Sequence, residues 1–263
     1  MSSALAKGSS SRFAAPSKND MTAASQSTAT ATPLLHPIQI KPNPLAQSAR
    51  HAFPALLAGL FVVRFRALVA DPVWAMATTL MLSAVLQVAY AVICLPPAGS
   101  SQGGAARAAR KPRPGEKKRV GFESAAGPNA IATSLLSLIL SGLVTPFLYI
   151  CLVLFGAPFL THTAHTLLCA AHLSVLALFP LFYVHGVDAV SWAAVGGFSA
   201  PLDETFGGLV GALVGAWLGA VPIPLDWDRD WQKWPVTILC GLYAGYLLGR
   251  ELGGSSLVWG KRF

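Results

Sequence analysis

Two apolar segments carry a glycine at every fourth position: Gly207-Gly-Leu-Val-Gly-Ala-Leu-Val-Gly-Ala-Trp-Leu-Gly219 and Gly241-Leu-Tyr-Ala-Gly-Tyr-Leu-Leu-Gly249. On an α-helix, residues four apart lie on the same face, so each segment would present a stripe of glycine. Glycine lets the backbones of two helices approach closely, which favours helix association in lipid. The pattern therefore predicts a membrane hairpin whose helix-packing residues are Gly207, Gly211, Gly215, Gly219, Gly241, Gly245 and Gly249.

A polar turn rich in tryptophan joins the two segments: Pro222-Ile-Pro-Leu-Asp-Trp-Asp-Arg-Asp-Trp-Gln-Lys-Trp-Pro235. Its alternating aspartates resemble the start of an EF-hand calcium loop, but Trp231 stands where that loop needs glycine and Thr237 where it needs glutamate. If the turn is helical, its tryptophans share one side, as in segments that lie among lipid headgroups. The turn is either an aromatic anchor or a contact for lipid or a partner, with candidate residues Asp226, Trp227, Asp228, Arg229, Trp231 and Trp234.

The composition indicates a membrane protein. Hydrophobic residues make up 54% of the chain, charged residues make up 11%, and the mean hydropathy is +0.55. Since a helix of about 20 apolar residues crosses a hydrocarbon core of about 30 Å, we expect an all-α membrane protein, a polytopic bundle of about six transmembrane helices. The apolar segments are 53–70, 73–95, 131–155, 164–184, 206–222 and 235–252.

The placement of lysine and arginine predicts the orientation of this bundle. Five precede the first segment, seven lie in the connection 96–130 and three follow Gly249, whereas only Arg229 and Lys233 fall on the opposite side. The positive-inside rule makes the first group cytosolic, and an even number of spans puts both termini there. We expect a disordered cytosolic tail over 1–50, a membrane domain over 51–252 and a short tail over 253–263.

The basic connection 96–130 is expected to be a flexible cytosolic loop that touches anionic lipid. Nucleic-acid binding is the weaker interpretation, because neither aromatic residues nor a folded module accompany the charges.

Arg64 and Arg66 interrupt the first apolar segment. An arginine at the bilayer centre costs about 2.5–3.5 kcal/mol on insertion scales and is a functional candidate by default. Because the guanidinium group binds phosphate through two parallel hydrogen bonds, Arg64 is a candidate for contact with lipid or a partner. The alternative is a shifted first helix whose arginines snorkel to the surface.

The sequence gives little support for catalysis or metal binding. The four cysteines lie in apolar segments without CxxC spacing, which favours buried thiols. No carboxylate accompanies His165 and His172 in their segment, so hydrogen bonds between helices are the preferred interpretation over zinc. Motifs such as GxSxG, HExxH and the phosphate-binding loop do not occur. We therefore assign neither catalytic residues nor metal ligands.

Several stretches of the chain are similar to one known family. The most specific is Gly219–Pro235, and the others are Leu68-Val-Ala-Asp-Pro72, Phe155-Gly-Ala-Pro158 with Thr161-His162 and His165-Thr166 behind it, and Tyr183-Val-His-Gly-Val-Asp188. Together, over about residues 50–250, they resemble the PIG-F family of glycosylphosphatidylinositol (GPI) anchor biosynthesis.

The resemblance implies a multi-pass protein of the endoplasmic reticulum that acts as the stabilising, non-catalytic subunit of GPI ethanolamine-phosphate transferases. It implies that a partner subunit, whose luminal domain holds zinc, moves ethanolamine phosphate from phosphatidylethanolamine to a mannose of the GPI glycan. No cofactor is then expected in this chain, and its partners would be the catalytic subunit, GPI and phosphatidylethanolamine. The alternatives are a lipid-handling transferase in its own right and a small lipid transporter or flippase.

Overall fold

The computed structural model describes residues 35–100, 128–225 and 227–262. Within these ranges the chain forms helices and their connections, and no strand, so the all-α prediction is confirmed. The predicted tail up to residue 34, most of the basic loop (101–127) and the candidate residue Asp226 lie outside the described residues.

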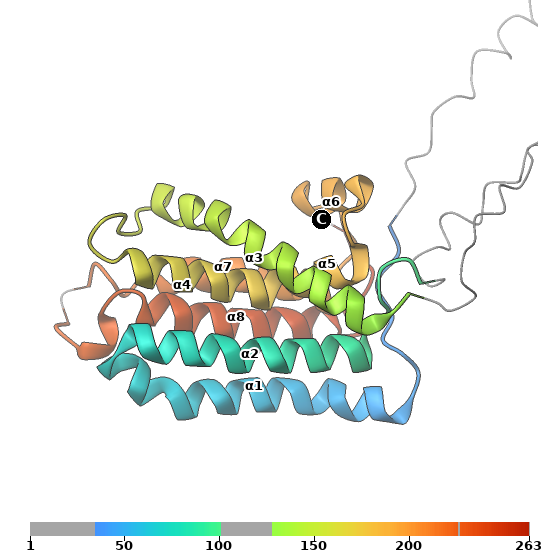
Figure 1. The fold of residues 1–263 in the computed structure, drawn as a ribbon, viewed down its shortest axis with the longest axis horizontal. Coiled ribbons are helices and arrows are strands. Elements are labelled where there is room, and N and C mark those ends of the chain that lie inside the picture. The colour runs from blue at the N-terminus through green and yellow to red at the C-terminus, as the bar shows by residue number, and fades with distance from the viewer. Residues whose placement is uncertain (1–34, 101–127, 226, 263) are drawn as a thin grey trace, which may run out of the picture. The chain divides into compact units, whose positions relative to one another are not determined.

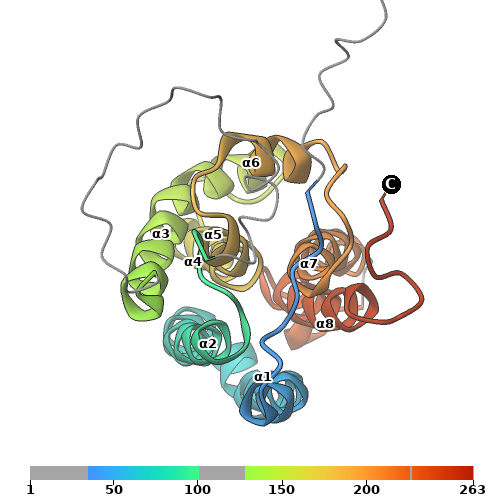
Figure 2. The same cartoon turned by 90° about the vertical axis from the view of Figure 1, so that its right-hand side faces the viewer.

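The long helices run roughly along one direction and lie side by side (Figure 1). In the end-on view of Figure 2, α4 and α5 lie between α2, α3 and α7, while α1 contacts α2 and α8. The elements are α1 (Pro44–Ala70), α2 (Pro72–Cys94), α3 (Ala130–Leu154), α4 (Thr163–Leu173), the π-helical segment η1 (Ser174–Leu178), α5 (Phe179–His185), α6 (Ala189–Gly196), α7 (Glu204–Gly219), the 3₁₀ turn η2 (Asp230–Gln232) and α8 (Val236–Gly253).

Four stretches are long and apolar enough to cross a membrane: α1, α2, α3 and the continuous rod Thr163–His185 formed by α4, η1 and α5. This rod is the most buried of the four, because it has neighbours on several sides. The hairpin helices α7 and α8 are shorter, with 16 and 18 residues, and α8 ends in the charged pair Arg250 and Glu251. The expected bounds of the apolar segments agree with these helices, with the first as the main exception.

The first helix begins at Pro44, nine residues before the expected start at residue 53. The Asn43 side chain caps it by accepting a hydrogen bond from the backbone N–H of Ala46, and proline suits the first helical turn because it has no N–H to leave unpaired. The segment before the helix is packed as well, since the N–H of Lys41 donates to the Cys94 carbonyl. The prediction of a disordered tail as far as residue 50 is therefore wrong for residues 35–50.

A proline inside the rod Thr163–His185 leaves a backbone carbonyl that another helix then uses. Pro180 has no N–H to donate to the carbonyl of Leu176 four residues earlier, and this carbonyl accepts a hydrogen bond of 3.0 Å from Gln87 Nε2 of α2. The same amide group donates to the hydroxyl of Tyr246 on α8, also at 3.0 Å. Gln87 thereby joins α2, the central rod and α8 in the interior of the bundle.

Replacing Gln87 with methionine should destabilise the bundle, because the Leu176 carbonyl and the Tyr246 hydroxyl would both lose a donor away from water. Hydrogen bonds between membrane helices average roughly 0.6 kcal/mol and reach about 1.7 kcal/mol, so we expect a loss of about 1–2 kcal/mol. Thermal unfolding of the purified protein in detergent measures it. Gln47→Met, the same change at an exposed position of α1, should have little effect, and equal melting of the two variants would contradict this role of Gln87.

Candidate functional site

The glycines predicted to pack helices lie at the contact between α7 and α8. A Cβ atom added at Gly211 would lie 2.7 Å from the Cα of Gly249, and one added at Gly249 would lie 2.7 Å from the Cα of Gly211. The same holds one turn further along, where Gly215 faces Gly241 and Gly245. We call this contact the glycine seam, formed by Gly207, Gly211, Gly215 and Gly219 of α7 and by Gly241, Gly245, Gly249 and Gly253 of α8.

The glycine seam brings the two backbones into direct contact. At Gly211, Gly215 and Gly241 a Cβ would overlap a carbonyl oxygen of the facing helix. The hydrogen that takes the place of this Cβ therefore points at that oxygen, in a Cα–H···O arrangement worth about 0.5–1 kcal/mol. Since each helix covers the glycines of the other, these faces close the hairpin itself and are not open to another subunit. The outward face of α7 remains apolar and exposed, at Leu213, Val214, Trp217 and Leu218.

The turn between α7 and α8 is irregular, not a helical turn. Only η2 (Asp230–Gln232) is helical, Asp228 has a positive φ of 49°, and Arg229 and Lys233 are extended. The Gln232 amide group holds this shape by donating to the carbonyls of Pro222 and Leu225. The tryptophans are consequently not equivalent, and the expectation that they share one helical side is wrong.

Trp227 is exposed and its ring lies 5.8 Å from that of Trp231, whereas Trp231 and Trp234 pack partly against the apolar core. Aromatic side chains that pack against apolar residues beside exposed charged residues are typical of a segment at a membrane surface. The structure therefore anchors two of the predicted indoles and leaves the third free for contact.

Charged residues of the same turn border an open pocket of about 410 Å³. Lys233 Nζ donates a hydrogen bond of 2.7 Å to Asp230 Oδ1, and this bond, together with the lysine charge, lowers the pKa of the Asp230 carboxyl below its usual value. The pocket thus offers both signs of charge at one place. Its charged and polar lining residues are Asp228, Arg229, Asp230, Gln232 and Lys233.

Arg64 lies away from this turn, on α1, and contacts α2. Its Nη2 atom donates a hydrogen bond to the hydroxyl of Thr78.

Two histidines of the rod Thr163–His185 were expected to make hydrogen bonds between helices, and His172 does so. It is fully buried and forms hydrogen bonds with the Met76 carbonyl at 3.1 Å and with the Tyr243 hydroxyl at 2.9 Å. His165 packs its ring against His162. Within the described ranges, no group of three His, Cys, Asp or Glu residues is placed to hold a metal ion.

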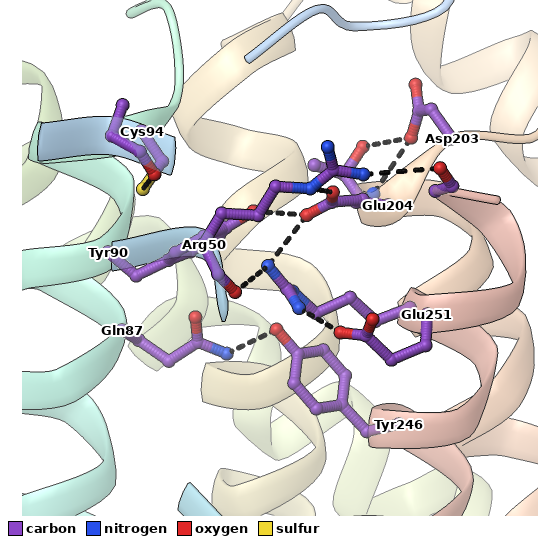
Figure 3. A network of polar contacts seen from close by, with 12 residues as sticks. Arg50, Gln87, Tyr90, Cys94, Asp203, Glu204, Tyr246 and Glu251 are labelled. Atoms are coloured by element: carbon purple, nitrogen blue, oxygen red, sulfur yellow. Dashed lines mark hydrogen bonds and ion pairs between the residues drawn. The ribbon is translucent and has the colours of Figure 1, made fainter. Parts of the chain in front are cut away.

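A buried cluster of charges that the sequence analysis did not anticipate lies at the opposite end of the bundle. Glu204, the first residue of α7, is 5% exposed, and Arg250 of α8 is 1% exposed. Arg250 Nη2 lies 2.7 Å from Glu204 Oε2, the hydroxyl of Tyr90 donates to the same oxygen at 2.7 Å, and Arg50 Nε pairs with Glu204 Oε1. Figure 3 shows how this carboxylate gathers side chains from α1, α2 and α8. We call Arg50, Tyr90, Glu204 and Arg250 the charge cluster.

The remaining bonds of Arg250 complete the cluster. Nη1 pairs with Glu251, and Nη2 also approaches the backbone oxygen of Arg50 at 3.3 Å. That oxygen is available because Pro54, four residues later, has no N–H to donate to it. The guanidinium lies over the stacked rings of Phe53 and Tyr90, with Cζ 5.3 and 4.8 Å from their centroids. The cluster therefore ties the ends of four helices, and its Arg50 and Glu204 border an open pocket of about 210 Å³.

Asp203 fixes the start of α7 next to this cluster. Its Oδ1 accepts hydrogen bonds from the backbone N–H groups of Thr205 and Phe206, which makes it the N-cap, and its Oδ2 accepts one from the N–H of Ile38 at 2.9 Å. The sequence contained a signal for the position of Asp203 and of the charge cluster. If the glycine stripes of an antiparallel hairpin face each other, the residues just before Gly207 lie beside those just after Gly249.

The chain is similar in sequence to several known proteins and to a family profile. The chain is 64% identical to the glycosylphosphatidylinositol anchor biosynthesis protein 11 of Neurospora crassa over 87% of its own length and 82% of the relative. It is 44% identical to the protein of the same name from Aspergillus fumigatus, over 87% of the chain and 86% of the relative. It is 32% identical to the human GPI ethanolamine phosphate transferase, stabilizing subunit, over 43% of the chain and 54% of the relative.

No solved structure matches the chain. The profile of the GPI biosynthesis protein family Pig-F matches residues 52–254. This range runs from the third turn of α1 to the residue after α8. It includes the glycine seam, the turn between α7 and α8, and Tyr90, Glu204 and Arg250 of the charge cluster. The chain therefore belongs to the GPI biosynthesis protein family Pig-F.

Proposed function

We propose that the chain is a membrane-embedded, non-catalytic subunit that stabilises a GPI ethanolamine-phosphate transferase in the endoplasmic reticulum. The observation that carries the proposal is the family match over residues 52–254, together with the names of the human and mouse relatives, both called a stabilizing subunit of this transferase. The interior of the bundle supports it. Glu204, Arg250, Gln87 and His172 use their polar groups to join helices.

The proposed bundle has six spans, with α7 and α8 as the fifth and sixth. The starts of α1 and α7 and the ends of α2 and α8 meet in the charge cluster and its neighbours, as an alternating path through six rods requires. Lys41, Arg50, Arg250, Lys261 and Arg262 are positive residues of this end, which supports a cytosolic location for it and for both termini. The tryptophan turn would then lie at the luminal surface.

The catalytic subunit would contact the outward, apolar faces and the luminal turn, since the glycine seam is covered. The free indole of Trp227 and the charges of Asp228 and Arg229 lie where a luminal domain or the headgroup of GPI or phosphatidylethanolamine could reach them. The chain itself would need no cofactor, and zinc would belong to the partner. Ethanolamine-phosphate transfer by the purified chain alone would establish the alternative of an enzyme in its own right.

Deletion of the gene, followed by mass analysis of accumulated GPI lipids, tests the proposal. We expect precursors that lack a terminal ethanolamine phosphate, because the unassembled transferase would be lost. Re-expression of the chain should restore the complete lipid, and unchanged GPI species after deletion would contradict the proposed role.

A further inference from the structure

Arg64 carries a charge that its partners in the structure do not neutralise. It lies on α1 six residues before the last residue, Ala70, which is about 9 Å along the helix axis. Its Nη2 donates to the hydroxyl of Thr78, while Nε is buried without a hydrogen-bond partner in the described part of the chain. The ion pairs among the described residues involve Arg50, Arg250 and Lys233, and none involves Arg64.

Thr78 holds the guanidinium but adds no negative charge. Its hydroxyl group lies 2.9 Å from the Trp74 carbonyl and 3.1 Å from the Ala75 carbonyl of its own helix, so its proton is used there and its oxygen accepts from Arg64. A positive charge in apolar surroundings is costly unless an anion or water reaches it. Arg250 meets this need with Glu204, whereas no ion pair among the described residues involves Arg64.

The surroundings of Arg64 open towards the bilayer. Val62 and Val63 next to it are 71% and 79% exposed, and Trp74 is 68% exposed. Trp74 precedes Thr78 by one helical turn and is thus nearer the start of α2, at the α1–α2 turn, where the lipid headgroups begin. Its indole N–H is a second hydrogen-bond donor, because the indole nitrogen donates and does not accept. A guanidinium and an indole on a lipid-facing surface form a pair of donors whose available anion is a lipid phosphate.

We propose that Arg64, supported by Thr78 and joined by Trp74, binds the phosphodiester group of a membrane phospholipid in the leaflet at the α1–α2 turn. The guanidinium has donors left for two phosphate oxygens, the geometry in which arginine binds phosphate best. Binding draws one headgroup below the plane of its neighbours, as buried arginines do when they thin the bilayer locally. This inference goes beyond the proposed function and does not depend on it.

The test is a lipid titration of the purified full-length chain in a maltoside detergent, followed by native mass spectrometry. Phosphatidylethanolamine is the probe, and diacylglycerol with the same acyl chains is the control that lacks phosphate. We expect one tightly bound phosphatidylethanolamine and no comparable binding of diacylglycerol. Arg64→Gln should weaken the binding at least about tenfold, which corresponds to the loss of a charge-assisted hydrogen bond. Arg66→Gln, at an exposed arginine of the same helix, should leave it unchanged.

Two further variants separate binding from a merely structural role. Arg64→Lys keeps the charge but not the planar guanidinium group, so it should bind the lipid with intermediate strength. This variant replaces Arg64→Gln in the test if Arg64→Gln does not fold. Thr78→Val should retain the lipid, because Thr78 contributes no charge to it. Equal lipid binding by wild type and a folded Arg64→Gln or Arg64→Lys variant would overturn the proposal. Inorganic phosphate that displaces the lipid, and whose binding depends on Arg64 as strongly as lipid binding does, would indicate a water-filled anion site. That result would overturn the assignment to a lipid.

Discussion

Gly211→Leu is expected to prevent α7 and α8 from packing and thereby to remove the folded protein. The added side chain would begin with a Cβ that overlaps the Gly245 carbonyl oxygen and lies 2.7 Å from the Cα of Gly249. Side chains can rotate away from such a clash, but backbone atoms cannot, so the helices must separate along the whole seam. The cost should exceed the roughly 1–3 kcal/mol that extra methylene groups usually cost in a packed core. Yield and thermal unfolding of the purified chain measure it.

Gly142→Leu provides the matched control. This glycine also lies inside a long apolar helix, α3, but a Cβ added there meets nothing within 4 Å. The variant should express and melt like the wild type, or slightly better, because leucine favours helix over glycine by about 0.8 kcal/mol. If Gly211→Leu were as stable as Gly142→Leu, the close packing of α7 on α8 would be wrong. Gly211→Ala should lie between the two.

Glu204→Leu should be the most damaging change among the charged residues. It would leave Arg250, which is 1% exposed, without its carboxylate partner, and would remove the acceptor of the Tyr90 hydroxyl. Breaking one side of a buried ion pair typically costs about 3–5 kcal/mol, because the remaining charge stays buried. We expect a loss of this size in thermal or denaturant unfolding. Glu251→Leu, at the 57% exposed partner of Arg250, should cost less than about 1 kcal/mol.

A second substitution separates the lost pair from lost packing. In the double variant Glu204→Leu, Arg250→Met no buried charge remains, and Arg50, which is 29% exposed, can turn to water. The double variant should therefore recover much of the stability, as buried ion pairs replaced by apolar residues often do. A double variant that is less stable than Glu204→Leu would mean that Arg250 contributes through packing on Phe53 and Tyr90 more than through charge.

The helices could be predicted from the sequence because lipid imposes long apolar runs and proline and glycine mark their ends. The bounds expected for α2 and α3 differ from the observed ones by one residue, Pro72–Cys94 against 73–95 and Ala130–Leu154 against 131–155. The glycine stripes predicted which faces of α7 and α8 allow a close approach. They did not predict which helix each stripe packs against. The same pattern is expected whether the two stripes of the hairpin face each other or each faces a helix of another subunit.

Contacts between residues distant in sequence could not be predicted in the same way. Arg50, Tyr90, Glu204 and Arg250 lie at the edges of four different apolar segments, where charged residues normally face water or lipid headgroups. Their burial follows from the way the helix ends meet, and a single sequence does not contain that geometry. The spacing of the tryptophans would place them on one side only if the turn were helical, but Gln232 donates to the carbonyls of Pro222 and Leu225 and fixes another shape.

The stability of the transferase's catalytic subunit tests the central claim most directly. In cells that lack this chain, the half-life of a tagged GPI ethanolamine-phosphate transferase should shorten, and wild-type chain should restore it. The Gly211→Leu chain should not restore it, whereas the Gly142→Leu chain should. A catalytic subunit that is equally long-lived with and without this chain would contradict its role as a stabilising subunit.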